Sequence, residues 1–379
     1  RAAWAAPGAR RPRAMGQVLP VPNTLKDSGD AAAPSKGLRW GHSCMQGWRF
    51  SMEDAHFAVA SLQGEGWEDF AAFGVLDGHG GKEVAQFCQK QLPAQIGKGS
   101  SLNAQAALVE AFHRMDEMLH IMHEDPLSDA AYNPFGSGSS NANPYWMGCT
   151  AVVCLVRSDV ILVANAGDSR AVLSRSGLAI SLSEDHKPNL PQEKQRIQRA
   201  GGHIERHQIG DNVQYRVNGN LNLSRSIGDL EYKRAEHLPA DEQMICATPD
   251  VRATPREPED EFLLLACDGI WDCMSSQEAV DFVSERLPYA RQRGLRLSSI
   301  LEEMLDACVS PDLAATRGLG GDNMTALLVV FGEPGAEPGT CSPTCASIEG
   351  AASAPIFDQE CESLAVKQAN AYCGCGHSW

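Results

Sequence analysis

The sequence predicts an α+β domain built in layers, and two features of the chain lead to that prediction. Short apolar runs follow one another across turns of only a few residues, as antiparallel strands do. Longer segments with the periodicity of helices lie between these groups of strands. We therefore expect antiparallel sheets with helices packed against them.

The strand candidates are runs rich in Val, Ile, Leu, Ala and Phe that are bounded by turn-forming or charged residues. The segments 157–159 and 174–177 are short enough to be hairpin turns, so the strands around them form an antiparallel meander. In chain order, the predicted strands are 55–62, 70–76, 150–156, 160–164, 170–174, 262–267 and 325–331.

The helix candidates carry recognisable start and stop signals. Pro191 stands at the start of one helix, and Gly201 and Gly202 follow its end. Ser275 or Ser276 can cap the helix that follows. In chain order, the predicted helices are 82–92, 102–124, 191–200, 276–286 and 297–309.

We expect one folded domain over residues 37–332, between two segments of different composition. Residues 1–36 are rich in Ala, Pro and Gly and lack periodicity, which predicts disorder. Residues 333–379 form a tail rich in Pro, Gly and Ser, for which we also expect disorder. Within the domain, residues 128–147 are typical of an inserted surface loop.

Composition excludes several classes of protein. Against 32 basic residues there are 48 acidic ones, which gives a formal net charge of −16 in 379 residues. Binding to nucleic acid needs a basic surface, so we expect no nucleic-acid partner. A transmembrane helix needs roughly 18 consecutive apolar residues, and no run approaches that length.

The 13 cysteines favour a reducing compartment rather than a framework of disulfides. Several lie in apolar runs and are typical of small buried side chains. Those in the tail are free thiols on one hypothesis and metal ligands or acylation sites on another. The tail cysteines are Cys341, Cys345, Cys361, Cys373 and Cys375.

The start of the chain bears on localisation. The arginines among alanines in residues 1–14 resemble part of a transit peptide, whereas Met15 followed by Gly16 resembles a translation start. Myristoylation of Gly16 would add weak membrane association, although Pro20 stands where that motif prefers Ser or Thr. We otherwise expect a cytoplasmic or nuclear protein.

Four aspartates far apart in the chain lie in similar apolar contexts flanked by glycine: Asp77, Asp168, Asp268 and Asp322. A carboxylate at the end of a buried strand is costly unless positive charge meets it. Convergence of such carboxylates would build a site for a divalent cation, and oxygen-only ligands favour Mg²⁺ or Mn²⁺. Asp168 alone is equally compatible with a plain hairpin turn.

Two further motifs are typical of a site that binds both a cation and an anionic substrate. Glu53 and Asp54 precede a predicted strand, and Arg49 just upstream could bind an anion through two hydrogen bonds. The carbonyl of Gly78 could bind a hard cation, and His79 beside it could protonate a leaving oxygen. Taken singly, the acidic pair is more often a solvated turn, and a lone histidine is more often structural.

The motifs together make the chain similar to the metal-dependent protein phosphatases, the type 2C serine/threonine phosphatases. The resemblance runs from about residue 38 to 331. In family order, the motifs are R-x-x-M-E-D at 49–54, D-G-H-G-G at 77–81, G-C-T-A at 148–151, A-N-A-G-D-S-R at 164–170, S-E-D-H-K-P at 183–188, N-L-S-R-S-I-G-D at 222–229, C-D-G-I-W-D at 267–272 and G-D-N-M-T at 321–325.

The resemblance implies a sandwich of two antiparallel sheets flanked by helices on both sides, and a centre with two metal ions. Asp77 would bridge the two ions. Asp268 and Asp322 would complete one metal site, and Glu53 with the carbonyl of Gly78 would serve the other.

The resemblance also implies roles for the residues around the two ions. Asp54 would support the ligands, and Asp168 with Asp268 would form a third, weaker metal site. Arg49 would hold the substrate phosphate, and His79 would act as general acid. We expect the loop at 225–229 to be architectural and the segment after it, to about residue 248, to form a variable flap.

The implied activity is hydrolysis of phosphoserine and phosphothreonine in proteins by a water molecule that bridges two divalent cations. The expected partners are phosphorylated proteins, and we expect a monomer. One alternative is a catalytically dead relative that binds phosphoproteins; it is disfavoured because the ligand residues are present. The other is a two-metal nuclease, which the negative charge disfavours.

Overall fold

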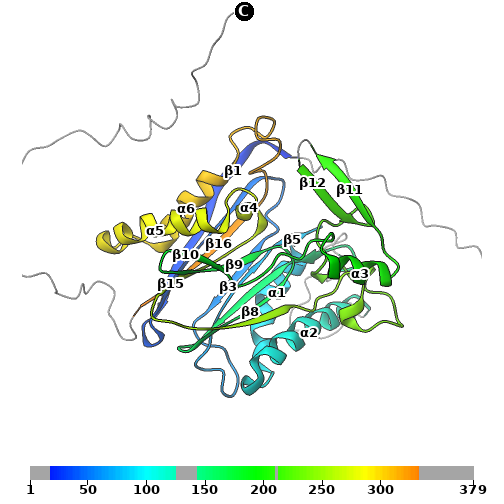
Figure 1. Cartoon of the computed structure of the whole chain (residues 1–379), viewed down its shortest axis with the longest axis horizontal. Coiled ribbons are helices and arrows are strands. Elements are labelled where there is room, and N and C mark those ends of the chain that lie inside the picture. Colours follow the sequence, from blue (N-terminus) through cyan, green and yellow to red (C-terminus); the bar gives the residue numbers. More distant parts are fainter. Residues whose placement is uncertain (1–17, 125–142, 210–211, 333–379) are drawn as a thin grey trace, which may run out of the picture. The chain divides into compact units, whose positions relative to one another are not determined.

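Two antiparallel sheets lie face to face, and helices cover the outer face of each sheet (Figure 1). The computed structural model describes residues 18–124, 143–209 and 212–332. Contacts divide the chain into Arg1–Gly339 and Thr340–Trp379, and every described residue belongs to the first unit. The predicted sandwich of antiparallel sheets with helices on both sides is confirmed.

The first sheet has the strand order β1-β2-β16-β15-β9-β10, and each neighbouring pair is antiparallel. Its strands are β1 (Val18–Ala33), β2 (Leu38–Arg49), β9 (Arg170–Arg175), β10 (Leu178–Ser181), β15 (Asp260–Ala266) and β16 (Met324–Phe331).

The second sheet has the order β14-β8-β7-β4-β3 and is also antiparallel throughout. Its strands are β3 (Ala55–Val59), β4 (Ala71–Leu76), β7 (Ala151–Val156), β8 (Val160–Ala166) and β14 (Asp250–Pro255). Two small sheets complete the set: β5 (Gly78–His79) with β6 (Gly148–Cys149) and β13 (Ile227–Gly228), and the hairpin of β11 (Ile204–Ile209) with β12 (Asn212–Val217).

The long helices form the two outer layers. Helices α1 (Glu83–Gly97) and α2 (Ala104–Glu124) pack on the second sheet, and α5 (Ser276–Arg293) and α6 (Leu297–Cys308) pack on the first. The shorter helical elements are α3 (Pro191–Arg199), α4 (Asp268–Trp271), η1 (Pro34–Lys36), η2 (Ser101–Asn103), η3 (Leu230–Tyr232) and η4 (Ala240–Glu242).

Strand β16 shows why the layers form. All 8 of its residues are buried, because alternate side chains enter different cores. Leu327 and Val329 pack between the two sheets, whereas Leu328 and Val330 pack under α5 and α6. A strand covered on both faces reads as a continuous apolar run, which is how the sequence presents it.

Each predicted strand and long helix has a counterpart, although α1 continues to Gly97 and α5 to Arg293, past the predicted ends at 92 and 286. Strands β1, β2, β10, β11, β12 and β14 were not predicted. The expectation of disorder up to residue 36 is wrong for residues 18–36, because β1 pairs with β2 along its length and is tied to α6. Asp30 accepts a hydrogen bond from the amide of Leu297 at 2.6 Å, and Lys26 pairs with Asp306 at 2.6 Å.

Some predictions fall outside the described residues. These are the start of the chain to residue 17, most of the inserted loop and the tail with its cysteines. Within the described ranges, no helix combines the length and the apolar character that a membrane crossing requires.

Candidate metal centre and active site

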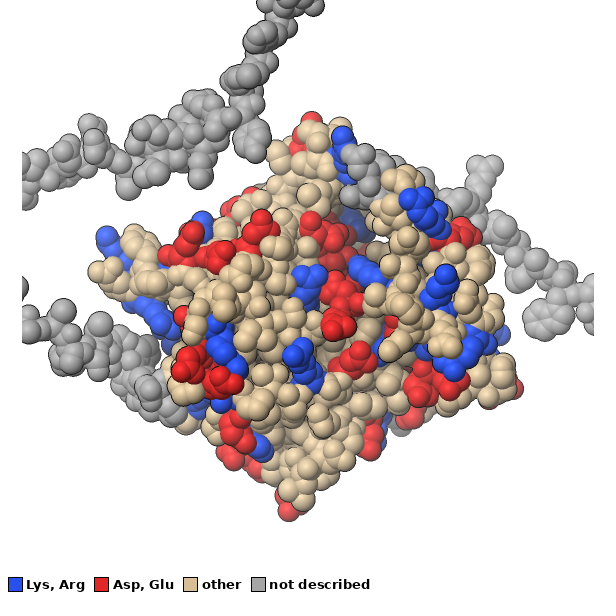
Figure 2. Space-filling model, viewed as in Figure 1, with Lys and Arg blue, Asp and Glu red and all other residues tan. Residues whose placement is uncertain are grey.

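The aspartates singled out in the sequence lie at the ends of strands that meet at one end of the sandwich. Asp77 directly follows β4, Asp168 links β8 to β9, and Asp268 opens α4 after β15. One carboxylate oxygen from each of these three residues lies within 4.8 Å of the others. Figure 2 shows acidic side chains gathered between the places where Figure 1 labels α4 and β5, with basic side chains beside them.

These carboxylates are short of positive charge. Burial, reinforced by the neighbouring aspartates, raises the pKa of Asp77 and of Asp268 well above the ordinary value of 3.8. One cation beside them is Lys187, whose ammonium donates to Asp168 at 2.5 Å. Such a cluster of hard oxygen donors fits divalent cations such as Mg²⁺ and Mn²⁺, which would supply the missing charge.

Asp54 lies on the other side of Asp77. Its carboxylate, Asp77 and the thiol of Cys267 form a second group of close ligand atoms. Burial raises the pKa of Asp54 to about 7, although the hydroxyl of Thr325 donates to it at 2.7 Å. This depth agrees with the supporting role that the resemblance implied, rather than with a ligand at the surface.

Glu53 is held at the rim by the loop between β2 and β3. Its carboxylate accepts hydrogen bonds from the hydroxyl of Ser51 at 2.7 Å and from the amide of Gly81 at 3.1 Å. Its own amide donates to the side chain of Asn323 at 3.0 Å, and Asn323 donates in turn to the carbonyl of Ser51. Asn323 therefore organises this loop, a role that the sequence did not reveal.

Gly78 allows the backbone segments of the site to come together. A Cβ atom at this position would lie 2.2 Å from the carbonyl oxygen of Glu53, so any other residue would push the two loops apart. Gly78 also pairs with Cys149 in the small sheet of β5 and β6. This packing fixes the place of the carbonyl predicted to bind a cation.

Arg49 and Asp322 form an ion pair at the edge of the site. The guanidinium approaches the carboxylate to 2.5 Å, and the two side chains are 50% and 37% exposed. Asp322 also lies close enough to Asp77 to contribute to its raised pKa. Arg49 is thus fixed beside the carboxylates while part of its guanidinium faces solvent, as a binder of phosphate requires.

His79 is bonded to Asp229, a residue that the sequence analysis assigned to an architectural loop. Its Nε2 lies 2.7 Å from Asp229, whose carboxylate also accepts from the hydroxyl of Ser226 at 2.6 Å. Burial opposes protonation of His79, but the charge of Asp229 outweighs it and the pKa of His79 is raised. The sequence motif contained Asp229 but gave no sign of this contact.

The loop that carries Asp229 is anchored to α2. Asp116 accepts hydrogen bonds from the amide of Gly228 at 2.8 Å and from the ammonium of Lys233 at 2.6 Å. The architectural role expected of Arg225 agrees with its contacts, because its guanidinium bonds Glu193 at 2.7 Å and Asp250 at 2.7 Å. The loop therefore combines a structural arginine with an aspartate that belongs to the site.

Comparisons with known proteins agree with this geometry. A family model described as "Protein phosphatase 2C" matches residues 38–315. "Probable protein phosphatase 2C 11" of Oryza sativa subsp. japonica is 42% identical over 352 residues, which cover 84% of this chain and 92% of that protein. "Protein phosphatase 2C homolog 2" of Schizosaccharomyces pombe is 43% identical over 326 residues and covers 84% of this chain and 79% of its own length.

A solved structure shares the fold at lower sequence identity. The crystal structure of a phosphatase from a pathogenic strain of Toxoplasma gondii superposes with a TM-score of 0.62 and 24% identity. The match covers 81% of this chain and 96% of that one. It therefore extends over most of the described sandwich.

Proposed function

The chain belongs to the protein phosphatase 2C family, and from that premise we propose how its carboxylate site works. The protein is a metal-dependent phosphatase that removes phosphate from serine and threonine residues of proteins. The observation that carries the proposed mechanism is the convergence of three carboxylates, Asp77, Asp168 and Asp268, whose oxygens lie within 4.8 Å of one another. We propose that two cations, Mg²⁺ or Mn²⁺, balance their charge.

In this proposal, the ligands divide between two positions around Asp77. Asp268 and Asp322 would hold one cation together with Asp77, and Glu53 and the carbonyl of Gly78 would hold the other. Asp54 supports the second position from beneath through its bond with Thr325. When bound, such cations would supply the positive charge that lowers the pKa of a water molecule and makes it a nucleophile.

A third, weaker position would use Asp168 and Asp268. The contact between these two carboxylates supports it. Lys187, which bonds Asp168 at 2.5 Å, would have to move aside or share the carboxylate. This competition gives a physical reason for weak binding at the third position.

Arg49 and His79 act on the substrate. Asp322 fixes the guanidinium of Arg49 at the rim, where its exposed N–H groups can bind two phosphoryl oxygens. Asp229 favours the protonated form of His79 and bonds its Nε2, which leaves Nδ1 as the nitrogen that donates a proton to the departing seryl or threonyl oxygen.

The catalytically dead alternative finds no support. A binding-only relative would have lost a ligand, whereas each predicted ligand residue is present and the core carboxylates converge. Because the chain belongs to the protein phosphatase 2C family, the alternative of a two-metal nuclease also has no support.

The experiment that tests the mechanism is phosphate release from a phosphothreonine peptide with Mn²⁺, with Mg²⁺ and with excess EDTA. We expect release with the metals and none with EDTA. The Asp77→Asn protein should lose turnover while remaining folded by circular dichroism. Asp306→Asn, which changes an exposed carboxylate in an ion pair with Lys26, is the matched control and should keep wild-type activity. Wild-type turnover by Asp77→Asn would remove Asp77 from the mechanism.

Localisation is a separate proposal. The cysteines in the described ranges are free thiols, which supports the expected reducing environment of cytoplasm or nucleus. Membrane association would require lipidation of Gly16, which lies outside the described residues. Fractionation of cells that express the tagged protein, with and without Gly16→Ala, tests both parts.

A further inference from the structure

Two cysteines meet beside the metal centre, where α4 packs against α6 (Figure 1). Cys273 lies just after α4, and Cys308 is the last residue of α6. The thiol of Cys273 donates to the carbonyl oxygen of Cys308 at 3.5 Å, and the two thiols are themselves hydrogen-bonded. The two residues are 35 positions apart in the chain, so the fold brings this pair together.

Cys273 differs from the other cysteines in its exposure. Among the cysteines of the described ranges, it alone is not buried. A small hydroperoxide in solution therefore has access to this residue, whereas Cys308 is only 6% exposed. The pair combines an accessible thiol with a shielded one beside it, which is the usual arrangement of a redox-sensitive cysteine and its resolving partner.

The surroundings of Cys273 favour its thiolate, which is the form that attacks peroxides. The hydrogen bond from Cys308 lowers the pKa of the Cys273 thiol, and the amide of Gly320 adds a second hydrogen bond. Burial and the charge of Asp272 oppose this shift without outweighing it. Cys273 is therefore more readily oxidised than a thiol such as that of Cys154, whose pKa is raised by burial.

The sulfur of Cys273 also contacts both segments that carry ligands of one proposed metal position. Its thiol donates to the carbonyl oxygen of Gly269 at 3.5 Å, and Gly269 directly follows Asp268. On its other side, the sulfur accepts from the amide of Gly320, which lies two residues before Asp322. A chemical change at Cys273 therefore acts on the supports of both aspartates.

The end of α6 packs closely against the segment before Asp322. Gly320 has a φ of +74°, and a Cβ atom there would lie 2.3 Å from the carbonyl oxygen of Cys308. The amide of Ser310 donates to the carbonyl of Gly320 at 2.9 Å. Because these two backbone segments are in contact, a movement of Cys308 is transmitted to the segment that presents Asp322.

We propose that Cys273 and Cys308 form a reversible disulfide when the protein meets a hydroperoxide. This bond weakens the binding of a cation by Asp268 and Asp322. A disulfide brings its two sulfurs to about 2.05 Å, so its formation draws Cys273 away from its two backbone contacts. The effect on the cation rests on the function proposed above, whereas formation of the disulfide does not.

The reaction balances in two steps. The Cys273 thiolate attacks an oxygen of hydrogen peroxide, the O–O bond breaks, and the sulfur becomes a sulfenic acid. The departing hydroxide takes up the proton that the thiol had released and becomes water. The Cys308 thiol then attacks this sulfur, and the sulfenic hydroxyl leaves with the thiol proton as a second water. Two thiols are oxidised to one disulfide, and a dithiol reductant reverses the change.

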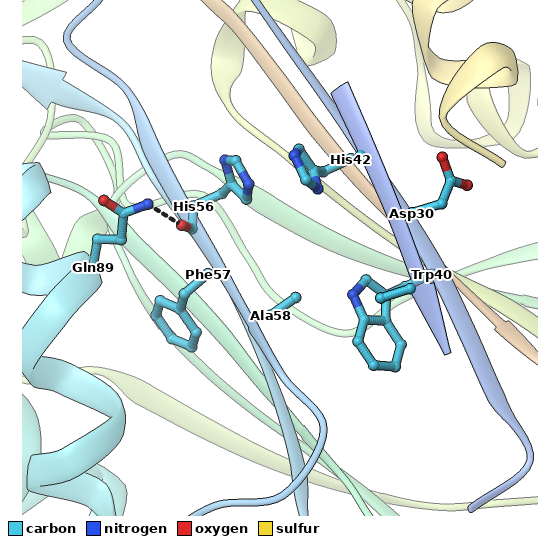
Figure 3. Close-up of a pocket in the computed structure, with 9 residues that line it drawn as sticks. Asp30, Trp40, His42, His56, Phe57, Ala58 and Gln89 are labelled. Carbon is cyan, nitrogen blue, oxygen red and sulfur yellow. Dashed lines mark hydrogen bonds between the residues drawn. The ribbon is translucent and has the colours of Figure 1, made fainter. Parts of the chain in front are cut away.

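Other thiols provide contrasts within the same molecule. Cys88 and Cys149 form a second pair at 3.7 Å, but both are fully buried. The sulfur of Cys44 lies 3.3 Å from His56, which lines a cavity of about 430 Å³ with His42 at its side (Figure 3). Cys44 is buried, burial raises its pKa to about 12, and an imidazole cannot complete a disulfide. We therefore expect neither Cys88 nor Cys44 to respond to peroxide.

The test exposes the full chain to hydrogen peroxide, removes the peroxide and blocks the remaining thiols with N-ethylmaleimide. Tandem mass spectrometry of unreduced tryptic peptides identifies each disulfide and distinguishes this pair from the cysteines of the tail. Titration with Mn²⁺ before oxidation, after oxidation and after dithiothreitol measures cation affinity. Cys273→Ser removes the accessible thiol, and Cys88→Ser and Cys44→Ser are matched controls that each remove a buried thiol.

We expect the oxidised wild type to yield a peptide that joins Cys273 to Cys308. Its Mn²⁺ affinity should fall by about tenfold or more and return with dithiothreitol. Cys273→Ser should keep its affinity, and both control variants should respond as the wild type does. Absence of the joined peptide from the wild type, or an equal loss of affinity in Cys273→Ser, would overturn the proposal.

Two further outcomes separate this proposal from the proposed function. The joined peptide with an unchanged Mn²⁺ affinity would overturn the link between the disulfide and the cation. A wild-type chain that binds no Mn²⁺ before oxidation would contradict the proposed metal mechanism, and the peptides would still show whether the disulfide forms. The peptide map of the wild type also decides the matter if Cys273→Ser does not fold.

Discussion

The hydrogen bond between His79 and Asp229 gives Asp229, which is not a proposed metal ligand, a role in the active site. The two side chains are separated by 150 residues in the chain and meet at 2.7 Å. Asp229 is buried, and its carboxylate also bonds Ser226. We infer that Asp229 is a positioning residue, which orients His79 and favours its protonated form rather than touching the substrate.

This inference predicts how Asp229→Asn behaves with different leaving groups. The variant should lower kcat by about tenfold or more on a phosphothreonine peptide, whose alkoxide leaving group needs a proton. It should have little effect on para-nitrophenyl phosphate, whose leaving group departs without one. Steady-state kinetics on the two substrates provides the comparison. Equal losses on both would indicate damage to the metal site instead.

A second residue-scale prediction concerns Glu193 on α3. Burial works against its charge, but Arg225 and Arg196 outweigh burial and lower the pKa of Glu193 from 4.5 to about 2. Because the pKa of Glu193 is lower in the folded state than in the unfolded state, its charge stabilises the fold. This stabilisation is complete above about pH 4.5 and is lost as the pH falls toward about 2. Glu193→Gln should therefore cost on the order of 3 kcal/mol of unfolding free energy at neutral pH.

Denaturant unfolding at pH 7 and near pH 2 measures this difference. The gap between wild type and Glu193→Gln should be large at pH 7 and should close at the acidic end. Glu285→Gln, which changes an exposed glutamate, is the control and should show no gap at either pH. A gap that stays constant with pH would assign the loss to packing rather than charge.

At the scale of elements, the predicted strands are those whose composition is a continuous apolar run, whereas β2, with Gly, His, Ser and Gln along its length, was not predicted although it is mostly buried. The strands β4, β7 and β15 are buried along almost their whole length, so their apolar runs are continuous. Strand β1 escaped prediction because it is a mostly exposed edge strand, held by backbone pairing and by contacts with α6. The sequence of β1 contains Pro, Asp, Gly and Ser and lacks the alternation of apolar and polar residues that marks a strand, so it resembles a disordered segment.

Asp30 provides a test of how β1 stabilises the fold. Helix α6 has no side-chain cap of its own, and Asp30 supplies one from β1 by accepting from its first amides. Asp30→Ala should therefore cost about 1–2 kcal/mol of unfolding free energy, as the loss of a helix cap does. Thermal or denaturant unfolding of the metal-free protein measures it. Asp27→Ala on the same strand is the control, and equal losses in both would argue against capping.

Only part of the candidate site could be predicted from the sequence, because some of its contacts join residues that are far apart in the chain. The ligand aspartates stand in motifs at strand ends, so Asp77, Asp168 and Asp268 were predictable, and the structure brings their carboxylates together. The roles of Asn323 and Asp229 depend on contacts across 270 and 150 residues of chain. Local patterns do not encode such contacts, because they arise only when the two sheets pack.

For the whole molecule, the sandwich acts as a scaffold that collects negative charge at one end. The strand ends from both sheets bring carboxylates together at a place where burial and mutual repulsion oppose ionisation. Stable packing of the two sheets and their helices offsets that cost. The working molecule therefore needs divalent cations to balance this charge, and in the proposed mechanism Asp77 is shared between two of them.

The measurement that tests this claim most directly is a titration of the metal-free protein with Mn²⁺, followed by calorimetry or by the electron paramagnetic resonance of free Mn²⁺. Wild type should bind two ions per chain tightly, and Asp77→Asn should lose tight binding of both because their common ligand is gone. Tight binding of two ions by Asp77→Asn, with affinities equal to those of the wild type, would contradict the account.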